Sequence, residues 1–116
     1  MDSKSSVILA KMLQHTISIM NYCPDCRSLE QFEANPMRVE ATVFNLMQIG
    51  ELAKGALDDE TKAKIKTIPW QQIYGLRNRI VHGYSGVSMQ IVWDTVQNDI
   101  PVLHNEIADF LAREGI

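Results

Sequence analysis

Long apolar runs are absent from this sequence, and their absence excludes several classes of protein. No stretch approaches the roughly 20 consecutive apolar residues that a helix needs to cross a bilayer, so no membrane span is expected. The first residues, MDSKSSVILAK, lack the uninterrupted apolar core and the small-residue cleavage site of a secretory signal. We therefore expect a cytoplasmic protein. Its 116 residues leave room for one domain, residues 1–116, around a single hydrophobic core.

An excess of positive charge is also missing. The formal net charge is −3, which argues against sequence-independent binding to long nucleic acids, because Lys and Arg must neutralise phosphates in such complexes. A local basic site stays open, since lysines gather at positions 62, 64 and 66 and arginines at 77 and 79. The lysine cluster is more typical of a solvated helix face than of a phosphate-binding track.

Cysteine is scarce, with one pair at Cys23 and Cys26. This C-x-x-C spacing occurs in redox pairs and in halves of zinc sites. A thioredoxin-like redox pair needs a strand before it, and the flanking sequence is helical. A tetrahedral zinc site needs four ligands, so a second pair would have to come from another subunit. Two reduced thiols in a loop, without an assigned function, are the expected state.

Strand patterns are absent as well, because apolar residues recur every three or four positions along the chain, as in helices. Asn35 with Pro36 and, later, Pro69 are good helix starts, whereas Pro101 predicts a kink or a restart near Asn98 or Asp99. The expected long helices cover about residues 3–21, 36–54, 70–83 and 88–111, with a shorter one near 58–66. The sequence therefore predicts an all-α, up-and-down bundle of four to five helices.

The helix expected at residues 36–54 is apolar over more than half of its circumference. The residues that produce this wide arc are Val39, Val43, Phe44, Leu46, Met47, Ile49 and Ala53. One face of a small isolated bundle cannot cover so wide an arc. Either this helix is central in the bundle, or its second face meets another subunit.

The stretch from Leu76 to Tyr84, LRNRIVHGY, carries the candidate chemistry. Arg77 falls inside the apolar arc of its helix, where a guanidinium is costly unless it is paired. Glu51 is the best structural partner; the alternative is a cleft in which Arg77 awaits an anion, and spacing alone does not separate the two. His82 can exchange protons near neutral pH. It lies about 140° from Arg77 on an ideal helix, so the two converge only if the helix frays at Gly83 or a second subunit contributes.

These residues carry a family resemblance. Arg77, His82 and Tyr84 match the Arg-x4-His-x-Tyr signature of the HepT-like toxins of the HEPN superfamily, with the usual Asn78 after the arginine. The segment Ile49-Gly50-Glu51 resembles the family's Ile-Gly-Glu, and Ile68-Pro69-Trp70 its Ile-Pro-Trp. Val92-Trp93 and Asp99-Ile100-Pro101 match the continuation. The resemblance covers most of the chain, from about Asn35 onward.

The resemblance implies a homodimeric helical bundle in which the motifs of both subunits face one cleft. It implies a toxin that cuts RNA without a metal or cofactor, with Arg77 and His82 as catalytic residues and Asn78, Tyr84 and Glu51 in support. It further implies a partner, a nucleotidyltransferase antitoxin of the MntA type, that adds AMP to Tyr84. In this chemistry His82 transfers protons and Arg77 stabilises the charge on the phosphate.

Two other classes of function remain open at this point. In the first, the protein is a non-catalytic module that binds a nucleotide or RNA and regulates a nucleotidyltransferase partner. Turnover on RNA distinguishes that module from a ribonuclease. In the second, the protein is a purely structural dimer in which Arg77 only pairs with Glu51. That class predicts that Arg77→Ala lowers stability and changes no RNA phenotype.

Overall fold

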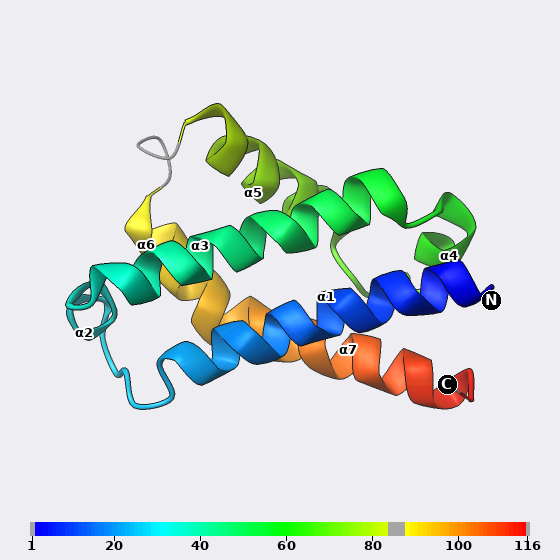
Figure 1. The fold of residues 1–116 in the computed structure, drawn as a ribbon, viewed down its shortest axis with the longest axis horizontal. Helices are drawn as coiled ribbons and strands as arrows, with labels where there is room; N and C mark the ends of the chain where they lie inside the picture. Colours follow the sequence, from blue (N-terminus) through cyan, green and yellow to red (C-terminus); the bar gives the residue numbers. More distant parts are fainter. Residues whose placement is uncertain (1, 84–87, 116) are drawn as a thin grey trace.

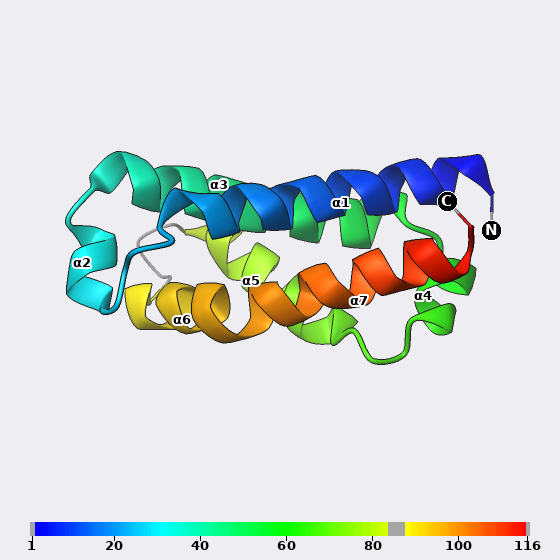
Figure 2. The ribbon, with the colours of Figure 1, turned by 90° about the horizontal axis from the view of Figure 1, so that it is seen from below.

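The computed structural model describes residues 2–83 and 88–115, and these form helices joined by short turns. Figures 1 and 2 show how the long helical segments of these residues pack against one another. They are α1 (Ser3–Tyr22), α3 (Pro36–Glu51), α5 (Trp70–His82) and the run of α6 (Met89–Asp94), the π-helical turn η3 (Thr95–Asp99) and α7 (Ile100–Arg113). The connections hold α2 (Leu29–Glu33), the π-helical turn η1 (Leu52–Ala56) and α4 (Asp59–Lys64). The expected all-α bundle is confirmed.

The helix starts follow the local sequence signals. Asp2 caps α1 by accepting a hydrogen bond from the backbone N–H of Ser5, and Asn35 caps α3 ahead of Pro36. Asp58 caps α4 in the same way through the N–H of Thr61. Ser88 precedes α6, as expected, but its side chain makes no capping hydrogen bond within the described residues.

Two π-helical turns adjoin long helices. The turn η1 follows the end of α3, and η3 lies between α6 and α7. The sequence predicted that the second long helix runs to about Lys54, with Gly55 available as its C-terminal cap. Instead α3 ends at Glu51, and η1 continues the coil to Ala56, with Gly55 inside the turn and the N–H of Leu57 donating to the carbonyl of Leu52. A π turn inserts one residue into the hydrogen-bond ladder and so widens the helix. The expected restart ahead of Pro101 is confirmed, because η3 ends at Asp99.

Helix α3 is the central element of the bundle. It packs against α1 on one side and α5 on the other, with α2 at its first turns, while α1 also packs against α7. The inward side of α3 is buried in the core through Val39, Val43, Leu46 and Ile49. Its outward side is not covered: Phe44 is 54% exposed and Met37 76%. The first explanation of the wide apolar arc is therefore confirmed, because the helix is central. Contact of its uncovered apolar face with another subunit stays a prediction.

The loop after α1 differs from the expectation for the cysteines. The structure joins Cys23 and Cys26 as a disulfide, with Cα atoms 5.3 Å apart, rather than as two reduced thiols. That separation suits a disulfide, and the turn between Tyr22 and α2 creates it. In the part of the chain that the structure describes, no helix is long and apolar enough to span a membrane.

Candidate functional site between α3 and α5

Arg77 points from α5 toward the end of α3 and meets Glu51 there. Its Nε donates to Glu51 Oε1 at 2.7 Å, and its Nη2 lies 2.7 Å from the same oxygen. The pair is partly open to solvent, with side-chain exposures of 21% for Arg77 and 43% for Glu51. The structural pairing with Glu51 is therefore confirmed, whereas binding of an anion by the partly exposed Arg77 stays a prediction.

Gly50 makes this arrangement possible. A Cβ placed on Gly50 would lie 2.3 Å from Cβ and 2.7 Å from Cγ of Arg77. Such distances are far below van der Waals contact, so any larger residue at position 50 forces α3 and α5 apart. The absence of a side chain at Gly50 therefore sets how closely Arg77 approaches Glu51, the next residue of α3. The sequence had singled out Gly50 only as part of the Ile-Gly-Glu segment.

Asn78 fixes the other end of the guanidinium. Its Oδ1 accepts a hydrogen bond of 2.9 Å from Nη1 of Arg77. The contacts to Glu51 and Asn78 use three of the five N–H donors of Arg77. With respect to the described residues, one N–H on Nη1 and one on Nη2 remain, and each can donate to an oxygen of a phosphate. Arg77 is thus oriented by the protein and has donors suited to an oxyanion.

His82 does not join this group within one chain. Helix α5 keeps its form up to His82, and Gly83 follows as the C-terminal cap, so the helix does not fray between Arg77 and His82. The His82 ring is exposed and makes no hydrogen bond among the described residues. Its position five residues after Arg77 leaves the two on different sides of α5. Tyr84, the last residue of the motif, lies outside the described residues.

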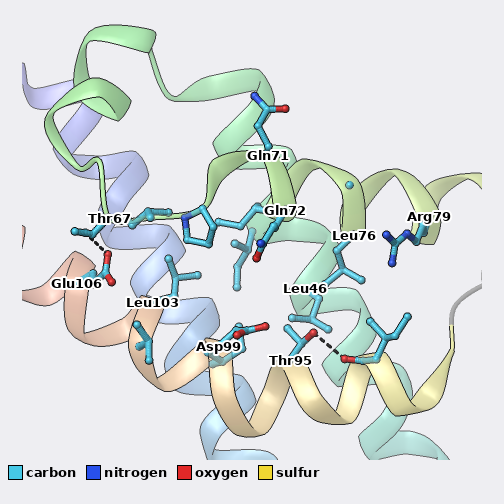
Figure 3. A pocket seen from close by; sticks show the side chains of 18 residues that line it. Leu46, Thr67, Gln71, Gln72, Leu76, Arg79, Thr95, Asp99, Leu103 and Glu106 are labelled. Carbon is cyan, nitrogen blue, oxygen red and sulfur yellow. Dashed lines mark hydrogen bonds between the residues drawn. The ribbon is translucent and has the colours of Figure 1, made fainter.

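A groove runs along the opposite flank of α5, between this helix and the α6–η3–α7 segment (Figure 3). It has a volume of about 670 Å³ and a floor that includes Leu46 and Ile49 of α3. A hydrogen bond from Thr67 to Glu106 closes one end. Arg79 contributes to the wall, whereas Arg77, Asn78 and His82 do not line the groove. This groove is therefore separate from the Arg77 group.

The described residues contain no cluster of three or more His, Cys, Asp or Glu side chains placed to hold a metal ion. The site between α3 and α5 is instead a single oriented cation with a carboxylate and an amide behind it. Such a group binds a phosphate and stabilises negative charge that develops on it. Among the described residues, His82 does not lie beside this group in the same chain.

The comparisons with known proteins agree with this chemistry. Residues 12–110 match the model of the family described as Ribonuclease HepT-like. A protein of Caldanaerobacter subterraneus subsp. tengcongensis with the name "Putative RNase TTE0752" is 36% identical over 87 residues, which cover 75% of this chain and 77% of the relative. "Probable ribonuclease HepT" of Thermococcus cleftensis is 32% identical over 74 residues, 64% of this chain and 66% of that protein.

A third relative extends the match over more of the chain. "Putative RNase MJ0125" of Methanocaldococcus jannaschii is 30% identical over 98 residues, which cover 84% of this chain and 83% of that protein. No solved structure is a significant match. The matched region of the family model contains the entire motif helix α5 together with Gly50 and Glu51 of α3.

Proposed function

The chain belongs to the HepT-like ribonuclease family, and we propose that it is a metal-independent endoribonuclease with Arg77 and His82 as its catalytic residues. The observation that carries the proposal is the orientation of Arg77. Glu51 and Asn78 hold the guanidinium, and one N–H on Nη1 and one on Nη2 have no partner among the described residues and can receive a phosphate of RNA. A purely structural ion pair does not require the second contact, to Asn78.

The reaction follows from the chemistry of the two residues. His82 takes the proton of a ribose 2′-OH, and the 2′ oxygen attacks the adjacent phosphorus. The bond from phosphorus to the 5′ oxygen of the next nucleotide breaks, and that oxygen receives a proton. Arg77 stabilises the negative charge that accumulates on the phosphate oxygens in the transition state. The products are a 2′,3′-cyclic phosphate and a free 5′-hydroxyl.

We propose that two subunits share this cleft. Within one chain Arg77 and His82 lie on different sides of α5, so one chain does not bring the cation and the proton-transfer group to the same phosphate. The uncovered face of α3, with Phe44 and Met37, ends at Glu51 and supplies an apolar surface next to the site. A two-fold axis at this face places the motif of one subunit opposite the motif of the other.

Regulation belongs to the same proposal. The family resemblance of the Arg77–Tyr84 motif supports a toxin that is controlled by an MntA-like nucleotidyltransferase antitoxin. In this scheme the antitoxin transfers AMP from ATP to the Tyr84 hydroxyl, with release of pyrophosphate. The added nucleotide carries a negative charge two residues from His82, where it competes with the RNA phosphate. Exposure of His82 at the end of α5 is consistent with access for such a modification.

Expression of the wild type and of the Arg77→Ala/His82→Ala double variant in a bacterial host tests the proposed function. We expect growth arrest and cleavage of total RNA with the wild type alone. Folded, expressed wild-type protein that neither arrests growth nor cleaves RNA would refute a free-standing toxin. Wild-type protein that binds RNA without turnover would instead establish the non-catalytic binding module.

A further inference from the structure

Tyr74 lies on the same flank of α5 as Arg77. It precedes Arg77 by three residues and Asn78 by four, the two spacings at which side chains on a helix are neighbours. The Tyr74 ring is half-buried and packs against the core. The flank of α5 that faces away from the groove therefore carries a continuous row made of Tyr74, Arg77 and Asn78.

Lys62 reaches this row from α4. Its ammonium nitrogen lies 5.0 Å from the centroid of the Tyr74 ring and 3.8 Å from a carboxylate oxygen of Asp59. The backbone carbonyl of Lys62 accepts a hydrogen bond of 3.2 Å from Nε1 of Trp70, the first residue of α5. Lys62 is thus held to α5 at both its backbone and its ammonium group.

The burial of Lys62 is unusual for a lysine. Its side chain is only 12% exposed, whereas Lys64 and Lys66 are exposed, as the sequence predicted for the whole cluster. Its carboxylate partner, Asp59, is fully exposed, and such a pair offsets little of the cost of taking the ammonium out of water. The ring face of Tyr74 also attracts the ammonium, and among the described residues Asp59 is its one carboxylate partner.

We propose that Lys62 and Tyr74 form a second subsite for RNA, in which Lys62 Nζ binds a backbone phosphate near the one that Arg77 binds. The inference rests on the proposed ribonuclease function. Tyr74 lies between the two cations and acts as a positioning residue, because its ring face holds the ammonium. Tyr74 contacts the ammonium and precedes Arg77 by three residues, so the two cations lie along one flank of α5.

This subsite resolves the conflict between the net charge of −3 and an RNA substrate. A few cations held along one flank of α5 replace a general positive surface. Because each such phosphate contact releases a counterion, loss of Lys62 changes the salt dependence of binding as well as its strength. A lysine with a structural role alone does not affect that dependence.

Binding of a short, fluorescein-labelled, fully 2′-O-methylated single-stranded RNA to the full chain tests the proposal, since this probe lacks the attacking 2′-OH. Lys62→Met removes the charge and keeps the apolar stem, and Lys64→Met is the matched control on the same helix. We expect about three- to tenfold weaker binding for Lys62→Met and a salt slope shallower by about 0.7. Lys64→Met binds like the wild type, and Lys62→Arg retains most of the affinity.

Equal effects of Lys62→Met and Lys64→Met would overturn the subsite, and so would an unchanged salt slope in a folded Lys62→Met protein. Cleavage of unmodified RNA by the wild type, measured in parallel, separates this failure from failure of the proposed function. If the wild type cleaves RNA and Lys62→Met binds the probe normally, only the subsite is wrong. If the folded wild type neither binds the probe nor cleaves RNA, both proposals are wrong.

Discussion

The backbone of Gly50 lies against the side chain of Arg77, so closely that a Cβ on Gly50 would be 2.3 Å from the Arg77 Cβ. This contact joins the two halves of the candidate site. It allows α5 to approach α3, and the approach brings the guanidinium to Glu51, whose Oε1 it meets at 2.7 Å. The interface between the two helices is therefore as much a part of the site as the charged residues are.

Gly50→Ala should move α5 away from α3 and misplace Arg77. Overpacking of this kind costs roughly 1–3 kcal/mol of stability. We also expect a loss of RNA cleavage that exceeds the loss of folded protein. Urea denaturation and a cleavage assay measure the two effects.

Gly75→Ala is the matched control, because Gly75 is also in a helix and a Cβ there meets no atom within 4 Å. Alanine in a helix is more favourable than glycine by about 0.5–1 kcal/mol, so this variant should be slightly more stable and fully active. Full activity of Gly50→Ala at wild-type stability would contradict the role given to the contact.

Variants of Glu51 should show whether the orientation of the Arg77 guanidinium contributes to catalysis in addition to its positive charge. Glu51→Ala removes the acceptor for both Nε and Nη2, and we expect kcat for RNA cleavage to fall while KM changes less. Glu51→Gln keeps a carbonyl oxygen as acceptor and should restore part of the activity. Because the pair is partly exposed, the stability change for Glu51→Gln should stay below about 1 kcal/mol. Equal activity of the two variants would argue against orientation by Glu51.

A mixture of two inactive variants tests whether the cleft is shared. If Arg77 of one subunit works with His82 of the other, a dimer of an Arg77→Ala subunit and a His82→Ala subunit keeps one intact site. Random mixing after unfolding and refolding together should then restore about a quarter of wild-type cleavage, since half of the dimers are mixed and each has one of two sites. No activity in the mixture would place both residues in sites built from a single chain.

The uncovered face of α3 predicts the position of the subunit interface. Phe44→Ser should produce a monomer, as measured by sedimentation equilibrium, because it removes an apolar side chain that is 54% exposed in the isolated chain. Val7 on α1 is 53% exposed, so Val7→Ser is a control of equal exposure at another face. The Phe44→Ser monomer should also lose cleavage. If the dimer persists in Phe44→Ser and dissociates in Val7→Ser, the subunit interface lies at α1 and not at the uncovered face of α3.

Asp58 makes the fold sensitive to acid. Hydrogen bonds from Thr61 and from Ser5 of α1 hold the pKa of this carboxyl below its ordinary value of 3.8. A carboxyl with a lowered pKa in the folded state stabilises the fold above its unfolded pKa, and that contribution is lost as the pH falls through the folded pKa. The melting temperature of the wild type should therefore drop below about pH 4, and Asp58→Asn should show a smaller drop. If the melting temperatures of the wild type and Asp58→Asn fall equally as the pH decreases, Asp58 is not the cause of the acid sensitivity.

The sequence by itself determined the class of fold and the starts of the helices. These features depend on neighbours within a few positions: the three- and four-residue spacing of apolar side chains, the caps at Asp2 and Asn35, and the restart before Pro101. Glu51 was also the best partner for Arg77 by its position on the apolar side of its own helix, and the structure shows this contact. The roles of Arg77, His82 and Tyr84 in catalysis and regulation stay predictions.

Only the tertiary structure decided which side chains meet across different elements. Helical periodicity gives the direction of a side chain around its own axis, but not the distance between two axes or their rotation about each other. The contact of Gly50 with Arg77 and the placement of Lys62 over Tyr74 depend on those quantities. The π turn after Glu51 and the pairing of Cys23 with Cys26 likewise follow from how the chain closes between packed helices, which no local pattern specifies.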